Sequence, residues 1–173
     1  MPFLYVSCVR DGKILWDQAA QISDQTFQEI SKGREPERGM VLYTAVGSFG
    51  HAAVVCDDRK FAFQRHVACI YPNDDLDSSF LAMWLESAFA KRHGDRVAIG
   101  NAQRTVTLGA LVLFPVMIPS LAEQRRLVEV AHVLDLRRVQ LFCSNLDESN
   151  IDHLTSLSFG RKGGSGLGTA PSA

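Results

Sequence analysis

Residues 118–127, IPSLAEQRRL, contain the boundary on which the expected fold depends. Ser120 and Glu123 match the capping box S-x-x-E, in which each side chain hydrogen-bonds to the backbone N–H of the other residue at the start of a helix. Neither proline nor glycine follows before Gly160, so the pattern predicts a single helix over 120–159. At 1.5 Å per residue this helix is about 60 Å long. A compact domain has little use for such a rod, and we expect it to act as a spacer or a docking element.

The apolar positions of the predicted helix are spaced approximately as in a coiled coil. They form two stripes, which are offset by a phase slip near residues 137–138. We expect the helix interface to be built by Leu127, Val130, Leu134, Phe142, Leu146 and Leu154. Because an isolated helix of this kind has no core to pack against, the stripes predict a partner helix. The glycine- and serine-rich residues 160–173 are expected to form a disordered tail.

Residues 1–119 alternate between strand and helix patterns, which predicts an α+β domain. Strands are expected where aromatic and β-branched residues concentrate, in PFLYVSCV (2–9) and MVLYTAV (40–46). The segments HAAVVC (51–56) and FAFQRHVACIY (61–71) predict a hairpin joined by the turn DDRK. The expected fold is therefore a recognition domain with a mixed or antiparallel sheet and short helices, followed by the long coiled-coil helix.

Two short helices are expected within this domain. Ser23 or Asp24 can cap a helix over DQTFQEISK, which Gly33 ends. The serines that close the loop PNDDLDSS can cap a second helix, FLAMWLESAFAKRH, ended by Gly94. Apolar residues of the second helix recur at spacings of three and four, so one of its faces should be buried.

Composition gives no support to nucleic-acid binding. The formal net charge of the 173 residues is −1. A protein that binds DNA alone is usually basic, because neutralised phosphates supply most of the non-specific affinity. No apolar run approaches the length of a membrane span, and no signal peptide begins the sequence, so we expect a cytoplasmic protein with no membrane contact.

The sequence lacks the motifs of several enzyme classes: GxxxxGK[ST], GxGxxG, GxSxG and HExxH. Its four cysteines form no CxxC pair and its histidines are not paired at ligand spacing, so neither a metal nor a cofactor is expected. The triplet Asp58-Arg59-Lys60, with Glu37 upstream, fits the pattern of a restriction-type nuclease. So short a pattern arises often by chance, and we interpret it as a solvated turn.

Two polar clusters have the chemistry to contact bases. Gln64-Arg65-His66 interrupts an apolar strand, and residues 100–105, GNAQRT, form a loop dense in amide and guanidinium donors. Asn and Gln can bind adenine through two hydrogen bonds, and Arg can bind guanine in the same way, so both clusters suit the major groove. The alternative is that they are ordinary polar loops and edge residues. His51 and His66 follow loop-like polar residues and are candidates for ligand contact or for packing.

The order of these segments resembles the target-recognition half of a type I restriction–modification specificity subunit. The matching segments span residues 2–160: PFLYVSCVRDGKI, RGMVLYTAVGSFGHAAVV, FAFQRHVACIYPN, SSFLAMWLESAF, GNAQRTVTLGALVLFPVMIPSLAEQRRL and the terminal LTSLSFG. The best single marker is the family pattern of proline, a small residue, leucine and then Glu-Gln before a long helix. Pro119 to Gln124 match this pattern.

The resemblance implies a non-catalytic component that binds double-stranded DNA at a bipartite site. It would direct methyltransferase subunits to that site, with a restriction subunit as a further partner. In that family a globular domain recognises half of a split sequence, and paired long helices set the spacing between the halves. By this analogy loops and strand ends contact the bases, and we expect the contacts at Arg10, Ser48, His51, Gln64, Arg65, Asn101, Gln103 and Arg104.

Subunits of that family usually carry two recognition domains and two helices, whereas this chain has one of each. Their recognition domain also begins some tens of residues before a segment like PFLYV, and that opening part is missing here. We therefore expect a homodimer through the long helix, most simply two-fold with antiparallel helices. Two other classes remain open: an interaction adaptor that binds no DNA, and the recognition end of a larger DNA methyltransferase.

Overall fold

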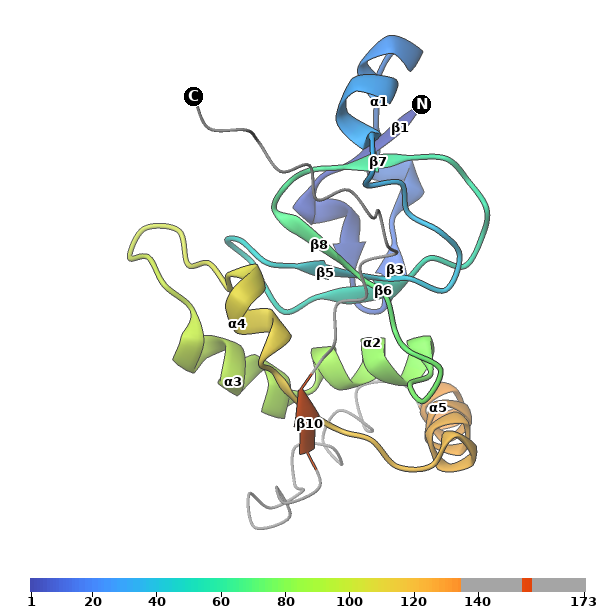
Figure 1. Cartoon of the computed structure of the whole chain (residues 1–173), viewed down its shortest axis with the longest axis vertical. Coiled ribbons are helices and arrows are strands. Elements are labelled where there is room, and N and C mark those ends of the chain that lie inside the picture. The colour runs from blue at the N-terminus through green and yellow to red at the C-terminus, as the bar shows by residue number, and fades with distance from the viewer. Residues whose placement is uncertain (135–153, 157–173) are drawn as a thin grey trace, which may run out of the picture.

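The structure, a computed structural model, describes residues 1–134 and 154–156. Its centre is an antiparallel sheet in which β5 (Val41–Thr44) lies between β6 (Ala52–Val54) and β8 (Val67–Ile70). Smaller sheets and short helices surround this sheet (Figure 1). The expected α+β class, with a mixed set of small sheets and short helices, is confirmed.

The side chains of β5 alternate between two hydrophobic clusters, because successive residues of a strand point to opposite faces. Val41 and Tyr43 belong to the cluster shared with α2 (Ser78–Glu86), whereas Leu42 belongs to the cluster shared with the N-terminal segment. All of β5 is buried. A strand that is covered on both faces has to be apolar throughout, which explains the unbroken segment MVLYTAV.

The N-terminal segment forms a second sheet on one side of the central sheet. In it β1 (Pro2–Leu4) pairs antiparallel with β4 (Ala20–Gln21) and parallel with β7 (Ala62–Phe63). Between β1 and β4 lie η1 (Val6–Cys8), β2 (Val9–Arg10), β3 (Lys13–Ile14) and η2 (Trp16–Gln18), of which β2 and β3 form a hairpin and η1 and η2 are 3₁₀ turns. The predicted helix at 24–32 is confirmed as α1 (Asp24–Ser31), which Ser23 caps.

The predicted hairpin between residues 51–56 and 61–71 is wrong. β6 and β8 do not pair with each other but occupy opposite edges of β5, and β7 belongs to the sheet of β1. The hairpin joins β5 to β6 instead. Gly47 (φ 75°) and Gly50 (φ 91°) adopt the left-handed backbone conformation that favours glycine, and this closes the short loop between the two strands.

The single helix predicted over 80–93 is two helices, α2 and α3 (Ala88–Val97). The break falls at Ser87, whose backbone is extended (ψ 154°) and whose hydroxyl caps α3. Asp77 caps α2, not the serines that follow it. Gly94, which was expected to end the helix, lies inside α3.

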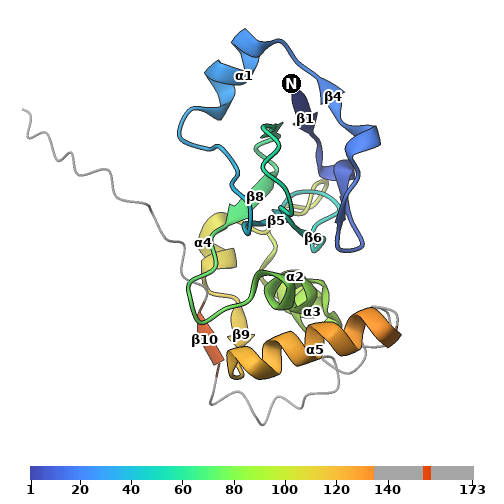
Figure 2. The ribbon, with the colours of Figure 1, turned by 90° about the vertical axis from the view of Figure 1, so that its right-hand side faces the viewer.

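Four elements complete the described chain. The short helix α4 (Leu108–Val112) leads into β9 (Pro115–Met117), which pairs antiparallel with β10 (Leu154–Ser156). Between them α5 (Leu121–Leu134) runs alongside α2 (Figure 2). Within the described ranges, no helix combines the length and the apolar character that crossing a membrane requires.

The capping box that predicted the start of the long helix is present. The Ser120 N–H and hydroxyl donate to Glu123 Oε2 at 3.0 and 2.6 Å, and the Glu123 N–H donates to Ser120 Oγ at 3.4 Å. The helix that begins there is described as far as Leu134. Residues 135–153 lie outside the described residues, and so does the expected tail over 160–173.

The continuous helix predicted over 120–159 is wrong at its C-terminal end. Leu154–Ser156 form a strand whose register pairs Leu154 with Met117 and Ser156 with Pro115. Pairing with β9 gives the backbone N–H and C=O groups of residues 154–156 hydrogen-bond partners, which the backbone groups at the end of an isolated helix do not have. Thr155 is also β-branched, and such residues favour a strand. The expected coiled coil of full length is therefore not what the described chain shows.

The expected interface residues fall in different surroundings. Leu127 packs, partly buried, against the hydrophobic cluster of its own domain, whereas Val130 is 41% exposed. Leu154 belongs to β10. Phe142 and Leu146 lie outside the described residues. Of the residues expected to contact a partner helix, Leu127 therefore packs on the core of its own domain, and Val130 is accessible to solvent.

Gln124 fixes the start of α5 onto the rest of the domain. Its side chain is fully buried, and its Oε1 accepts the N–H of Asp77, the residue that caps α2, at 2.8 Å. Its Nε2 donates to the carbonyl oxygens of Asp75 and Pro119, both at 2.8 Å. One amide therefore joins the first turns of α2 and α5, and it explains in physical terms why glutamine ends the segment PSLAEQ.

Candidate nucleic-acid interface

Three loops meet at one end of the central sheet, which we call the loop face. They are residues 45–51 between β5 and β6, residues 64–66 between β7 and β8, and residues 99–105 before α4. Two backbone hydrogen bonds from the first loop join all three: the Ala45 N–H donates to His66 O at 2.9 Å, and the Gly47 N–H donates to Arg104 O at 2.8 Å. Figure 1 shows these loops together on the left of the view.

The structure brings the predicted DNA-contact residues to this face or to its border. On the loops, Ser48, Arg65, Asn101 and Gln103 are exposed, while His51, Gln64 and Arg104 are partly buried. Arg10 lies on β2, and the turn after β2 bridges β6 through Gly12 and Ala53, two residues after the loop at 45–51. The sequence patterns therefore identified residues that lie together in space. Whether each of them contacts DNA remains a prediction.

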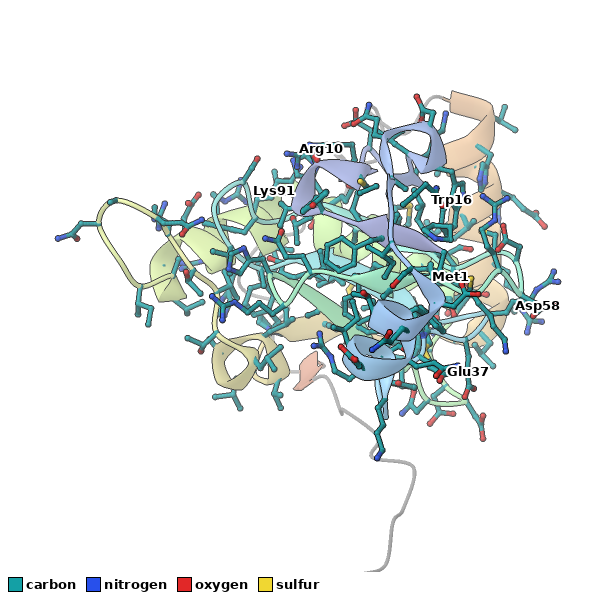
Figure 3. The ribbon with its side chains drawn as sticks, turned by 90° about the horizontal axis from the view of Figure 1, so that it is seen from above. Met1, Arg10, Trp16, Glu37, Asp58 and Lys91 are labelled. Atoms are coloured by element: carbon teal, nitrogen blue, oxygen red, sulfur yellow. The ribbon has the colours of Figure 1, made fainter. Side chains whose placement is uncertain are left out.

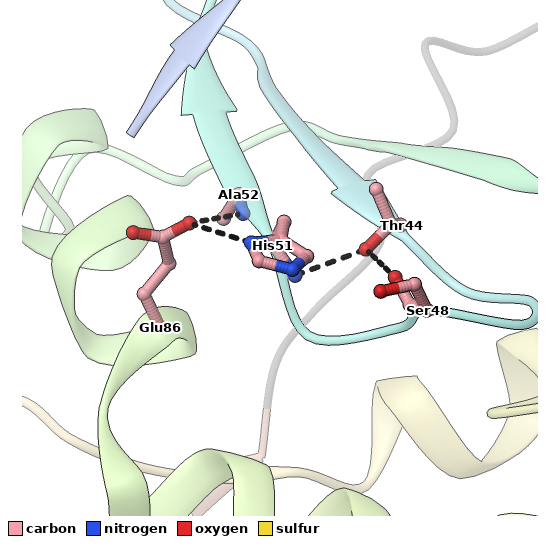
Figure 4. Close-up of polar contacts among 5 residues, drawn as sticks. All are labelled: Thr44, Ser48, His51, Ala52 and Glu86. Carbon is pink, nitrogen blue, oxygen red and sulfur yellow. Dashed lines mark hydrogen bonds and ion pairs between the residues drawn. The ribbon is translucent and has the colours of Figure 1, made fainter. Parts of the chain in front are cut away.

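Thr44 fixes the shape of the loop after β5. Its hydroxyl donates to Ser48 O at 3.1 Å and accepts the N–H of His51 at 2.9 Å (Figure 4). The Thr44 side chain is buried, so both hydrogen bonds of its hydroxyl are partly shielded from solvent. Only the backbone of Ser48 is used, and its side chain remains exposed on the loop face.

Glu86, a residue that the sequence patterns did not single out, lies beneath this loop. Its side chain is only 4% exposed, and its Oε1 accepts the Ala52 N–H at 3.1 Å. The same oxygen is 3.7 Å from His51 Nδ1 (Figure 4), an atom that is buried and has no hydrogen-bond partner in the described part of the chain. The sequence feature that could have identified Glu86 is that it is the only charged residue in the apolar segment FLAMWLESAF.

Burial dominates the protonation of this pair. Burial lowers the pKa of His51 below its usual value, and the positive charges of Arg10 and Lys91 lower it further, against a smaller opposite effect of Asp11. Burial raises the pKa of Glu86, against an opposing effect of its hydrogen bond from Ala52. At 3.7 Å the two side chains are in ion-pair range. We nevertheless assign His51 as neutral near pH 7, because desolvation and two nearby cations disfavour its charged form.

Arg104 is oriented by two neighbours. Its guanidinium forms an ion pair with Asp95 and also donates to the Asp95 carbonyl oxygen. Its Cζ lies 5.4 Å from the centre of the Phe49 ring, which is a cation–π contact. An added methyl group on Gly94 would lie 3.0 Å from Phe49 Cε2, so Phe49 in turn rests directly on α3. The loop at 99–105 is thereby tied to α3 and to the loop after β5.

Positive charge is concentrated around the loop face. Helix α3 lies beside the loop after β5, since a methyl group added to Gly50 would contact Lys91 Cγ at 3.2 Å. The basic residues on these elements are Arg10, Arg65, Lys91, Arg92, Arg96 and Arg104, against the exposed acids Asp11 and Asp95. Figure 3 shows Arg10 and Lys91 on one side of the molecule and Glu37 and Asp58 on the other. The formal net charge of −1 is therefore compatible with a locally basic surface around the loop face.

The nuclease-like triplet lies far from this face in Figure 3. Asp58, Arg59 and Lys60 are exposed and line, with Glu37, a pocket of about 220 Å³. The Arg59 N–H donates to Asp57 Oδ1 at 3.0 Å, as in an ordinary turn. Among the residues that the structure describes, no three His, Cys, Asp or Glu side chains are grouped so as to bind a metal ion.

Comparison with known proteins agrees with the resemblance. A family model described as "Type I restriction modification DNA specificity domain" matches residues 9–141, about three quarters of the chain. The matched range includes all three loops of the loop face, α3, and the helix α5. No curated protein matches the chain.

Proposed function

The chain belongs to the family of type I restriction–modification DNA specificity domains, and on this premise we propose that its loop face binds duplex DNA in a sequence-specific manner. The observation that carries the proposal is the meeting of three polar loops within a basic surface at one end of the central sheet. The chemistry of the exposed groups supports base contacts. Asn101 and Gln103 offer paired donors and acceptors for adenine, and Arg65 offers paired donors for guanine.

The cationic residues around the loops would contact phosphates. Lys91 on α3 and Arg10 on β2 both bring positive charge close to His51, so a DNA backbone that crosses this face meets cations beside the loop. Such contacts set register and orientation, while the base edges carry the sequence information. Arg104 is already paired with Asp95 and packed on Phe49, so its donors are pre-oriented before DNA arrives.

We infer that the protein is a non-catalytic component and that methyltransferase subunits, with a restriction subunit, supply the chemistry. Two copies joined through α5 and the residues after it would present two loop faces to the halves of a bipartite site. The spacing of half-sites would then follow from the symmetry of the dimer. Val130 and Val133, which are 41% and 82% exposed on α5, give this helix an apolar surface that its own domain does not cover.

A binding selection from randomised duplexes tests the proposal directly. The full chain, with and without a type I methyltransferase subunit, is expected to enrich one sequence motif, and its affinity should fall steeply with added salt. Replacing Gln103 and Arg104 by alanine should relax the motif, whereas the control Arg38→Ala, on an exposed loop away from the loop face, should leave it unchanged. If no sequence is enriched in either mixture while a complex with the methyltransferase subunit forms, the chain is an interaction adaptor and the proposal is wrong.

A further inference from the structure

The imidazole of His51 has one buried edge and one edge that faces outward. Nδ1 has no solvent exposure and no hydrogen-bond partner in the described chain, although the side chain as a whole is 20% exposed. The exposed part therefore belongs to the other atoms of the side chain. Nε2 is the remaining ring nitrogen, and it is not among the buried, unpaired atoms of the described residues.

Among the residues that the structure describes, Glu86 is the carboxylate within ion-pair range of the buried edge. Glu86 Oε1 lies 3.7 Å from Nδ1, which is longer than a hydrogen bond but within the range of an ion pair. Glu86 cannot move away freely, because the same oxygen accepts the backbone N–H of Ala52 and the side chain is 96% buried. A carboxylate in this place attracts a proton on Nδ1 and repels a lone pair there.

A neutral imidazole carries its single proton on one nitrogen, and the partner of that nitrogen decides which one. With the proton on Nδ1, the lone pair lies on Nε2. His51 then differs from the lysine and arginine side chains of the loop face, all of which are donors only. It would be an acceptor on a surface of donors.

We propose that Glu86 fixes the Nδ1–H tautomer of His51, so that Nε2 accepts a hydrogen bond from the exocyclic amino group of adenine or cytosine in the DNA target. This inference rests on the proposed function, since it assumes that the loop face contacts bases. Glu86 acts as a positioning residue, and His51 is the specificity-determining residue. Adenine N6 and cytosine N4 are the amino donors that the major groove presents.

Protonation of His51 would reverse the preference at this position. In the imidazolium both nitrogens are donors, and Nε2 would then favour the acceptors guanine O6, guanine N7 or thymine O4. The charges that face His51 are Glu86 on α2, Lys91 on α3, and Arg10 and Asp11 on the β2–β3 hairpin. The two cations oppose protonation, which keeps the acceptor available at neutral pH.

The tautomer can be tested without DNA. Long-range ¹H–¹⁵N NMR correlations distinguish an Nδ1–H from an Nε2–H imidazole in the full chain. We expect the Nδ1–H pattern for His51 in the wild type and a shift toward Nε2–H in Glu86→Gln, whose amide can donate to Nδ1. An Nε2–H pattern in the wild type, or an unchanged Nδ1–H pattern in a folded Glu86→Gln protein, would overturn the assignment.

The base preference is tested by the duplex selection, repeated at about pH 8 and about pH 5. One position of the enriched motif should favour adenine or cytosine at the higher pH and guanine or thymine at the lower pH. Arg38→Ala serves as the control, because it removes an exposed side chain away from the loop face and should leave both the motif and this pH effect in place. The same NMR measurement establishes whether His51 is protonated at the lower pH. A motif that stays identical when His51 is protonated contradicts the inference but not the proposed function, whereas the absence of any motif contradicts both.

Discussion

Single buried polar groups position the elements of this protein to an extent that apolar packing alone would not. Gln124 joins the first turns of α2 and α5 with three hydrogen bonds, and Glu86 anchors the strand that follows the loop of His51. Each group is costly to leave unpaired in a buried site. Because hydrogen bonds are directional and apolar contacts are not, these two side chains restrict the positions of the neighbouring backbone segments more tightly than apolar packing does.

Gln124→Leu should destabilise the domain. Leucine fills a similar volume but leaves the Asp77 N–H and two carbonyl oxygens without partners, which we expect to lower the free energy of unfolding by about 3 kcal/mol. Urea denaturation measures the change. Gln28→Leu, at an exposed position of α1, is the matched control and should change stability little. A loss of stability equal to that of the control would show that the amide network is unimportant.

His51 should make stability fall in mild acid. Its folded pKa is lowered from the usual 6.5, so the unfolded chain takes up the proton first as the pH falls. This contribution to stability is fully present above the usual pKa and is lost as the pH falls below about 6.5 toward the folded pKa. The advantage of the wild type over His51→Gln should accordingly be greater at about pH 7.5 than at about pH 5.5, measured by denaturation. An advantage that grows in acid would show that the charged imidazole is favoured.

At the scale of elements, sequence patterns located β1, the central strands, α1, the region of α2 and α3, and the start of α5, but not how the strands pair. The capping residues Ser23 and Ser120 act locally, within a few residues of their partners, and this is why they could be identified from sequence. The strand with which β6 and β8 pair is β5, which is buried on both faces. Which strand becomes buried in this way is decided by the packing of the whole core and not by a local sequence pattern. The break at Ser87 was missed because the apolar pattern continues across it.

In the candidate nucleic-acid interface, too, some residues could be identified from local sequence and others could not. Polar loops such as residues 100–105 were recognisable from their donors alone, and the structure places them on one face. Glu86 and Asp95 were missed because their roles depend on contacts with distant or folded neighbours: Glu86 with Ala52, and Asp95 with Arg104. No short-range pattern marks such a partner.

Gly94→Ala tests how α3 supports the loop face. An alanine methyl would lie 3.0 Å from Phe49 Cε2 and 3.6 Å from Phe114 Cζ, so the Phe49 ring must move and its contact with Arg104 must change. The helix itself gains about 1 kcal/mol of propensity, so we expect little loss of stability. Affinity for the selected duplex should fall several-fold, as measured by fluorescence anisotropy.

Gly109→Ala is the control for that change, because the nearest atom that its methyl would meet, Thr107 Oγ1, is 4.0 Å away. It gains similar helix propensity on α4 without touching Phe49. Equal affinity of the two variants for DNA would mean that Phe49 does not support the interface.

At the scale of the whole molecule, the elements around the loop face carry more basic than acidic residues, although the formal net charge is −1. The described part of α5 packs on its own domain through one side and exposes Val130 and Val133 on the other. A helix with both kinds of contact can connect a recognition domain rigidly to a second copy. The dimer remains a prediction, because it requires contacts between two copies of the chain.

Val130→Glu combined with Leu134→Glu should abolish self-association. Two carboxylates in the expected seam would have to be buried without partners, which opposes dimer formation. Light scattering of the purified protein should show a dimer for the wild type and a monomer for the double variant. Ala122→Glu, exposed on the first turn of the same helix, should remain dimeric. A dimer that persists in the double variant would place the interface elsewhere.

The most direct test of DNA recognition by the loop face is the map of methylated sites in cells that co-express the chain with a type I methyltransferase subunit. We predict one methylation motif for the wild type and for Arg38→Ala, and a relaxed or altered motif when Gln103 and Arg104 are replaced by alanine. A motif that stays unchanged in this double variant, and likewise in Arg65→Ala and His51→Gln, would contradict recognition by this face.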